Sequence, residues 1–206
     1  MVHLSGSAGS GKTLLATALA AKISRDYHVD WLSTDGKTGF IDYLKRNMNH
    51  YGGLPSNLTV TRTTTSSEAL TAVLETPSRI KPNSRLVVVD PITRVLDMAR
   101  NDDVLWGRTL FEESLPTLAG TAEANSLLIL IISEVRENEF GSQAVYHKKI
   151  KPWVVADYVL ERPYSRLKSH ILSLDDNASN EHVASIHLNE HGEVIVGETT
   201  SSLEVS

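Results

Sequence analysis

The sequence predicts an α/β protein whose central sheet is mostly parallel, is flanked by helices and gains an antiparallel extension at its C-terminal end. Up to residue 132, short apolar runs alternate with helical patterns, as expected of parallel strands joined by crossover helices. The runs Leu86 to Val89 and Leu127 to Ile132 are continuously apolar, which is typical of strands buried on both faces. After residue 153 strand patterns follow one another without helices, which favours antiparallel pairing.

The first half of the chain supplies four of these strands. They are expected at residues 2–4, 29–33, 58–62 and 85–90, with helices at residues 14–23 and 39–48 and a third helix that begins at the capping box Thr65-x-x-Glu68. Thr76-Pro77 is expected to end that third helix.

The second half is read in the same way. A polar loop is expected at residues 97–104, an amphipathic helix kinked near Pro116 at 106–124, a buried strand at 127–132 and a long loop at 137–152. Further strands are expected at residues 154–160, 166–174, 182–188 and 193–196. Residues 1–196 are therefore predicted to form one domain, and residues 197–206 a polar, disordered tail.

A glycine-rich loop lies between the first strand and the first helix. Its sequence, GSAGSGKT, fits the phosphate-binding pattern G-x-x-x-x-G-K-[ST]. Glycines let the backbone bend and turn its N–H groups toward phosphate oxygens, whereas a merely flexible Gly/Ser loop is the alternative. The predicted phosphate-binding residues are Gly6, Ser7, Ala8, Gly9, Ser10, Gly11, Lys12 and Thr13. Lys12 is expected at the β- and γ-phosphates and Thr13 at Mg²⁺, so ATP and Mg²⁺ are the predicted cofactors.

Three carboxylates follow predicted strands at the edge where parallel sheets bind ligands. Asp35 follows the second strand, Asp90 closes the strand at 85–90, and Glu134 follows the strand at 127–132. Asp90 is predicted to share the Mg²⁺ ion with Thr13, as the aspartate of a Walker B strand does. The alternative for Asp90 is a turn residue.

Composition limits the other classes of function. The chain has 206 residues, no cysteine and a net charge of −5, which excludes disulfides and thiolate sites and argues against a broad nucleic-acid surface. The N-terminus does not read as a secretory signal, and the longest apolar run is too short to span a bilayer. A soluble, cytoplasmic protein without a membrane partner is expected.

The order of these motifs resembles the RecA/RadA/KaiC superfamily of ATPases, and most of all its short archaeal RadA paralogues of the RadB type. The matching stretches are the glycine loop, Thr34-Asp35-Gly36, Asp90-Pro91-Ile92-Thr93 and Ser133-Glu134-Val135. The resemblance runs from His3 to about Val196 and implies a RecA-like core. It also implies an accessory role in DNA recombination and repair, single-stranded DNA as a partner, and assembly with itself or with a full-length RadA-type recombinase.

The resemblance further assigns catalytic roles to Lys12, Asp35 and Glu134, and two of these positions depart from the family pattern. Asp35 stands where the family has the Glu that activates water; being one methylene shorter, it implies slow hydrolysis. Glu134 replaces a Gln that senses the γ-phosphate, and a carboxylate there repels phosphate unless it binds metal, pairs with Arg136 or turns away. Relative to the family, the segment upstream of the first strand is also missing, so the chain is either a minimal version or has an incomplete start.

One basic cluster and one histidine cluster remain. Lys148, Lys149 and Lys151 are candidates for contacting DNA or a neighbouring subunit, although three loop lysines are commonly just solvated. His182, His187 and His191 invite a metal site, but strand alternation would place His182 and His187 on opposite faces.

Three other classes of function fit the sequence less well. A Ser/His/Asp hydrolase lacks the G-x-S-x-G elbow, and a small-molecule kinase lacks an Arg-rich lid. A KaiC-like nucleotide-dependent switch without a DNA partner remains the alternative function.

Overall fold

The computed structural model describes residues 1–101, 105–138, 141–162, 168–173 and 181–198. Its strands are β1 (Val2–Gly6), β2 (His28–Ser33), β3 (Leu58–Arg62), β4 (Ser84–Asp90), β5 (Leu128–Ile132), β6 (Val135–Asn138), β7 (Gly141–Ala144), β8 (Ala156–Glu161), β9 (Lys168–Ser173), β10 (Glu181–Leu188) and β11 (Val194–Glu198). Its helices are α1 (Lys12–Ile23), α2 (Phe40–Tyr51), α3 (Ser66–Leu74), α4 (Thr76–Arg79), α5 (Ile92–Asn101), α6 (Leu105–Ala124) and α7 (His147–Ile150), with short 3₁₀ turns η1 (Pro55–Asn57) and η2 (Lys151–Trp153).

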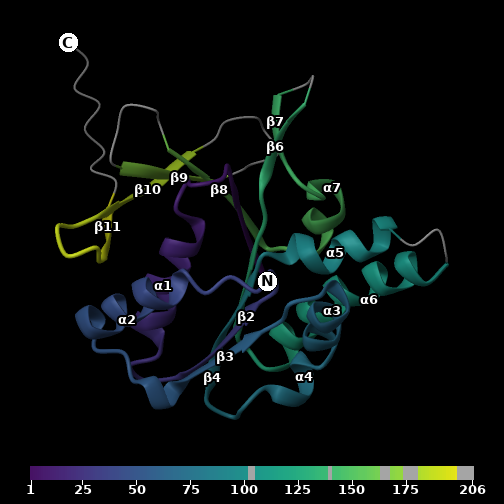
Figure 1. Ribbon diagram of the computed structural model, residues 1–206, viewed down its shortest axis with the longest axis horizontal. Helices are drawn as coiled ribbons and strands as arrows, with labels where there is room; N and C mark the ends of the chain where they lie inside the picture. The colour runs from purple at the N-terminus through teal and green to yellow at the C-terminus, as the bar shows by residue number, and fades with distance from the viewer. Residues whose placement is uncertain (102–104, 139–140, 163–167, 174–180, 199–206) are drawn as a thin grey trace.

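Nine of the described strands form one twisted sheet in the order β11-β10-β9-β8-β1-β5-β4-β2-β3 (Figure 1). Pairing is parallel from β3 through β8 and antiparallel from β8 to β11. The predicted α/β fold, with a mostly parallel sheet and an antiparallel extension, is confirmed. Strand β8 belongs to both parts, because it runs parallel to β1 and antiparallel to β9.

Helices cover both faces of the parallel part, which explains its unbroken apolar strands. On one face α1 and α2 pack over the sheet, with Trp31 stacked on Phe40 at a centroid separation of 4.7 Å. On the other face α3, α5 and α6 pack over Val87, Val89 and Ile129. Both faces of β4 and β5 are therefore buried, and the ends of these strands are held rigidly.

Two segments predicted as loops are ordered elements instead. Helix α5 extends to Asn101, across most of the loop predicted at residues 97–104, and residues 102–104 lie outside the described part of the chain. Buried Ile92, Val95 and Leu96 recur at helical spacing and carry this helix against the core. The loop predicted at 137–152 contains the hairpin β6–β7, helix α7 and the start of η2. Fully buried Ile150 anchors α7.

The remaining differences concern element boundaries. The helix predicted to end at Thr76-Pro77 ends earlier, at Leu74, and α4 begins at Thr76 because proline fits the first turn of a helix. Pro116 lies inside α6 as predicted. Strand β11 runs to Glu198, beyond the residue 196 predicted to end the domain, and the rest of the predicted tail lies outside the described residues.

Candidate nucleotide-binding site

The glycine loop joins the end of β1 to the start of α1 in a conformation that needs its glycines. Gly9 and Gly11 have φ angles of +76° and +100°, which L side chains rarely adopt. A Cβ on Gly6 would lie 2.5 Å from the carbonyl oxygen of Leu160 and 2.7 Å from Oγ of Ser10. The backbone therefore passes so close to β8 that only glycine fits at residue 6.

Lys12 opens α1 and folds back over the loop. Its ammonium donates hydrogen bonds to the carbonyl oxygens of Gly6 and Ser7, both at 2.8 Å, and the residue is 8% exposed. Burial lowers the pKa of Lys12, and the nearby carboxylates of Asp90 and Glu134 oppose that effect. A buried ammonium at the N-terminus of a helix is a strong attractor for an anion.

Thr13 and Asp90, the two residues predicted to bind Mg²⁺, meet across the site. The Thr13 hydroxyl donates a 2.7 Å hydrogen bond to Oδ2 of Asp90, at the end of β4. Burial raises the pKa of Asp90 to about 6, against the effect of the Thr13 hydrogen bond, and the charge of Asp35 adds to the rise. A hydroxyl and a carboxylate side by side are the oxygen ligands that Mg²⁺ prefers.

The turn after β2 places Asp35 beside this pair and adds a lysine. The Asp35 carboxylate accepts from the backbone N–H of Lys37 at 3.1 Å and forms an ion pair with its ammonium at 2.7 Å. The hydrogen bond between the Lys37 ammonium and Asp35, together with the negative charge of Asp35, raises the pKa of Lys37. Two hydrogen bonds from Thr34 join the turn to the end of β4. The Thr34 N–H donates to the carbonyl oxygen of Asp90 at 3.0 Å, and the Thr34 hydroxyl donates to the carbonyl oxygen of Pro91.

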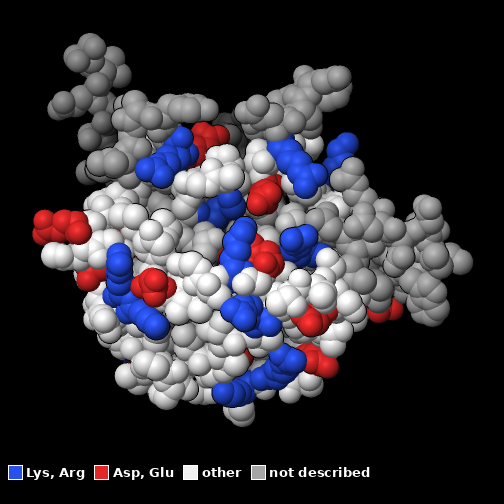
Figure 2. Space-filling view, viewed as in Figure 1, with Lys and Arg blue, Asp and Glu red and all other residues white. Residues whose placement is uncertain are grey.

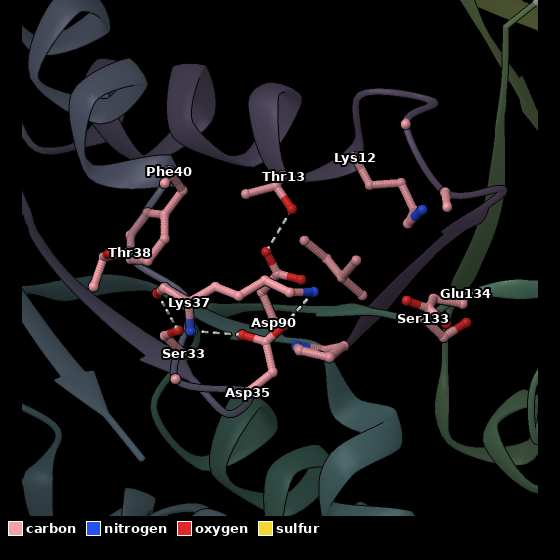
Figure 3. A pocket seen from close by; sticks show the side chains of 16 residues that line it. Lys12, Thr13, Ser33, Asp35, Lys37, Thr38, Phe40, Asp90, Ser133 and Glu134 are labelled. Atoms are coloured by element: carbon pink, nitrogen blue, oxygen red, sulfur yellow. Dashed lines mark hydrogen bonds and ion pairs between the residues drawn. The ribbon is translucent and has the colours of Figure 1, made fainter. Parts of the chain in front are cut away.

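These residues line one cleft of about 550 Å³ (Figure 3). Ala8, Gly9, Lys12 and Thr13 form its loop side, and Asp35, Asp90 and Glu134 its strand-end side. The other predicted loop residues, Gly6, Ser7, Ser10 and Gly11, do not line the cleft. The buried Ser10 hydroxyl has no hydrogen-bond partner among the described residues. Acidic and basic side chains are intermixed on this face, with both signs around its hollow (Figure 2).

Glu134 is exposed and follows β5 into the cleft. Its carbonyl oxygen accepts from the N–H of Val145 at 2.8 Å, which ties it to the hairpin β6–β7. Among the ion pairs that the structure describes, none joins Glu134 to Arg136. Of the three ways in which its charge was expected to be accommodated, pairing with Arg136 is therefore not the one seen.

A buried polar chain that was not predicted lies behind the cleft. His3 in β1 bonds through Nδ1 to Oδ1 of Asp157 and through Nε2 to Oγ of Ser133, both at 2.8 Å. His147 at the start of α7 bonds to the other oxygen of Asp157 at 3.0 Å. A histidine in the middle of an apolar strand was the available signal, but its partners lie more than 100 residues away. These hydrogen bonds connect the edge of the cleft to α7.

The predicted contact lysines lie on that helix and the turn after it. Lys148, Lys149 and Lys151 are exposed and do not line the cleft. Buried Ile150 fixes this segment to the core, so its lysines sit on an ordered surface rather than in the predicted loop.

The histidines of the C-terminal hairpin are arranged differently from the prediction. A β-bulge between His182 and Ala184 shifts the alternation of β10, so His182 lies on the same face as Ser185, 3.2 Å away, and as His187. The prediction of opposite faces for His182 and His187 is therefore wrong, because it assumed regular pleating. His182 contacts His170 at 3.1 Å. In the part of the chain that the structure describes, no group of three or more His, Cys, Asp or Glu side chains is placed to hold a metal ion.

The strand order and the glycine loop between β1 and α1 define a RecA/RadA-like fold. Comparison with solved structures finds 359 similar chains. One is the crystal structure of the RadB recombinase, with a TM-score of 0.74 and 17% sequence identity over 96% of this chain and 90% of that one. At this identity the likeness shows the fold.

Comparisons of the sequence itself give no further assignment. No protein-family model matches the chain, and no curated protein matches it. Within the described residues, no helix is long and apolar enough to cross a membrane.

Proposed function

We propose that this chain binds ATP with Mg²⁺, hydrolyses it slowly, and acts in the cytoplasm as an accessory factor in DNA recombination and repair. One observation carries the nucleotide part: Thr13 and Asp90 share a 2.7 Å hydrogen bond directly beside a glycine loop whose lysine is buried. Loop N–H groups and Lys12 would hold the phosphates, and Thr13 and Asp90 would hold Mg²⁺. The ion would neutralise phosphate charge.

Asp35 is the proposed general base. Its side chain is 11% exposed and faces the cleft, where it would take a proton from the water that attacks the γ-phosphorus. The bond from that phosphorus to the bridging oxygen breaks, and ADP and inorganic phosphate leave. Asp35 is one methylene shorter than the glutamate of the family that the sequence resembles, which supports slow turnover.

The repair role is supported by the likeness to the RadB recombinase and by the exposed lysines of α7 and η2. Lys148, Lys149 and Lys151 would contact the phosphates of single-stranded DNA or a neighbouring subunit. The buried hydrogen bonds that run from Ser133 to His147 connect the proposed nucleotide cleft to this surface. The partner would be a second copy of the chain or a full-length RadA-type recombinase.

ATP-dependent binding to single-stranded DNA tests this role. The variant Lys148→Ala/Lys149→Ala/Lys151→Ala is expected to weaken DNA binding and flatten its salt dependence. The matched control, Lys22→Ala/Lys45→Ala/Lys81→Ala, removes the same charge from exposed sites elsewhere and should leave DNA binding nearly unchanged.

The second candidate function is a KaiC-like switch that senses ATP and has no DNA partner. The carboxylate of Glu134, which lines the cleft, favours sensing over rapid turnover. If the wild-type protein binds ATP but DNA neither binds nor changes turnover, the repair role fails and the switch is supported.

A further inference from the structure

Acidic side chains outnumber basic ones among the described residues that line the cleft. Among the described residues that line it, Asp35, Asp90 and Glu134 are acidic, and only Lys12 and Lys37 are basic. Lys12 is bound to carbonyl oxygens of the loop. Lys37 is therefore the lysine of the cleft that is not bound to the phosphate loop, and a triphosphate brings at least two more negative charges into this volume.

The backbone of Lys37 is anchored by hydrogen bonds, whereas its side chain is exposed to solvent. Its N–H donates to Asp35 at 3.1 Å, and its carbonyl oxygen accepts from the Ser33 hydroxyl at 3.1 Å. Its side chain is nevertheless 77% exposed, whereas that of Asp35 is 11% exposed. A lysine has a flexible four-carbon stem, so the ammonium can leave Asp35 while the turn stays in place.

The ion pair itself is easily exchanged. Pairs with one exposed partner contribute little to stability because water competes with the carboxylate. A terminal phosphate carries up to two charges and three acceptor oxygens, which makes it the stronger partner for an ammonium. The charges of Glu134 and Asp90 also act on Lys37, and that of Lys37 acts on Lys12, so these groups share one electrostatic volume.

We propose that Lys37 binds the terminal phosphate of a nucleoside triphosphate and thereby frees Asp35, the proposed general base, for the attacking water. Without triphosphate its ammonium holds the Asp35 carboxylate. With triphosphate the ammonium moves to the terminal phosphate and releases Asp35 toward the attacking water. This inference rests on the proposed nucleotide site and adds a property to it: discrimination between triphosphate and diphosphate.

Equilibrium binding of a non-hydrolysable ATP analogue and of ADP, each with Mg²⁺, tests this assignment. Lys37→Met should weaken analogue binding about tenfold, as for one lost charge-assisted hydrogen bond, and change ADP binding less than about twofold. Lys37→Arg keeps the cation and should restore most of the preference. The control Lys45→Met removes an exposed lysine of α2 and should change neither affinity.

A second arm tests the exchange with Asp35. Asp35→Asn frees the ammonium and should strengthen analogue binding by more in the presence of Lys37 than in the Lys37→Met background. Equal losses for analogue and ADP in Lys37→Met, or no loss, would overturn the assignment of Lys37 while leaving the nucleotide site intact. A wild-type protein that binds neither nucleotide would overturn both.

Discussion

Asp90→Asn removes a carboxylate whose ionisation is opposed by its burial. The pKa of Asp90 rises from 3.8 to about 6, mainly through burial. A difference of one pKa unit corresponds to about 1.4 kcal/mol, so the charged form costs about 3 kcal/mol of folding free energy above pH 6. The amide oxygen of asparagine can still accept the hydrogen bond from Thr13. At neutral pH the variant should therefore be more stable than the wild type.

The sign of the pH dependence follows from proton binding. Between about pH 4 and pH 6 the folded chain holds a proton on Asp90 that the unfolded chain has lost, so the free energy of unfolding falls as pH rises through this window. Asparagine does not titrate. The advantage of Asp90→Asn should thus grow from about 1.5 kcal/mol at pH 5 to about 3 kcal/mol at pH 7.5.

Urea denaturation of both proteins at these two pH values, without nucleotide or Mg²⁺, measures this difference directly. The same variant should bind ATP with less dependence on Mg²⁺, because it lacks a carboxylate that is proposed to bind the ion. A variant less stable than the wild type at pH 7.5, or a stability difference independent of pH, would refute the assignment of Asp90 as a buried carboxylate kept for function.

Two further predictions concern the glycine loop and the buried chain behind it. Gly6→Ala should lower the free energy of unfolding by about 1–3 kcal/mol, because its Cβ would meet the backbone of Leu160. The control Gly120→Ala lies in open space on α6. It should instead raise the free energy of unfolding by about 0.5–1 kcal/mol. Equal effects in urea denaturation would contradict the tight passage of the loop past β8. His3→Leu should lower the free energy of unfolding by about 2–4 kcal/mol in the same assay, because it leaves buried polar groups of Ser133 and Asp157 without their histidine partner. An unchanged free energy of unfolding would show that these buried hydrogen bonds contribute nothing to stability.

The sequence predicted the parts of this structure that depend on local pattern. The glycine loop, the apolar run of β4 and the carboxylates after β2, β4 and β5 each follow from a few neighbouring residues, and the sheet brings all of them to one edge. Parallel strands share their carboxyl ends, so the meeting of Thr13 with Asp90 was predictable.

What the sequence did not reveal depends on contacts between distant segments or on small irregularities. Ile150 is buried in the core, but its neighbours in the sequence are basic and give no apolar pattern, so α7 was expected to be a loop. The bulge at His182 has no residue signature such as glycine or proline, and it reversed the expected face. Lys37 was overlooked because its role follows from its proximity to Asp35 in the turn rather than from a motif.

Equilibrium binding of ATP with Mg²⁺ to Lys12→Ala tests most directly whether residues 6–13 and Asp90 form an ATP site. The control Lys22→Ala removes an exposed lysine from the last turn of the same helix. We expect Lys12→Ala to weaken binding about 100-fold, through the loss of a buried ammonium that is proposed to bind phosphate, and Lys22→Ala to bind as the wild type does. Retained ATP affinity in a folded Lys12→Ala protein would contradict the account.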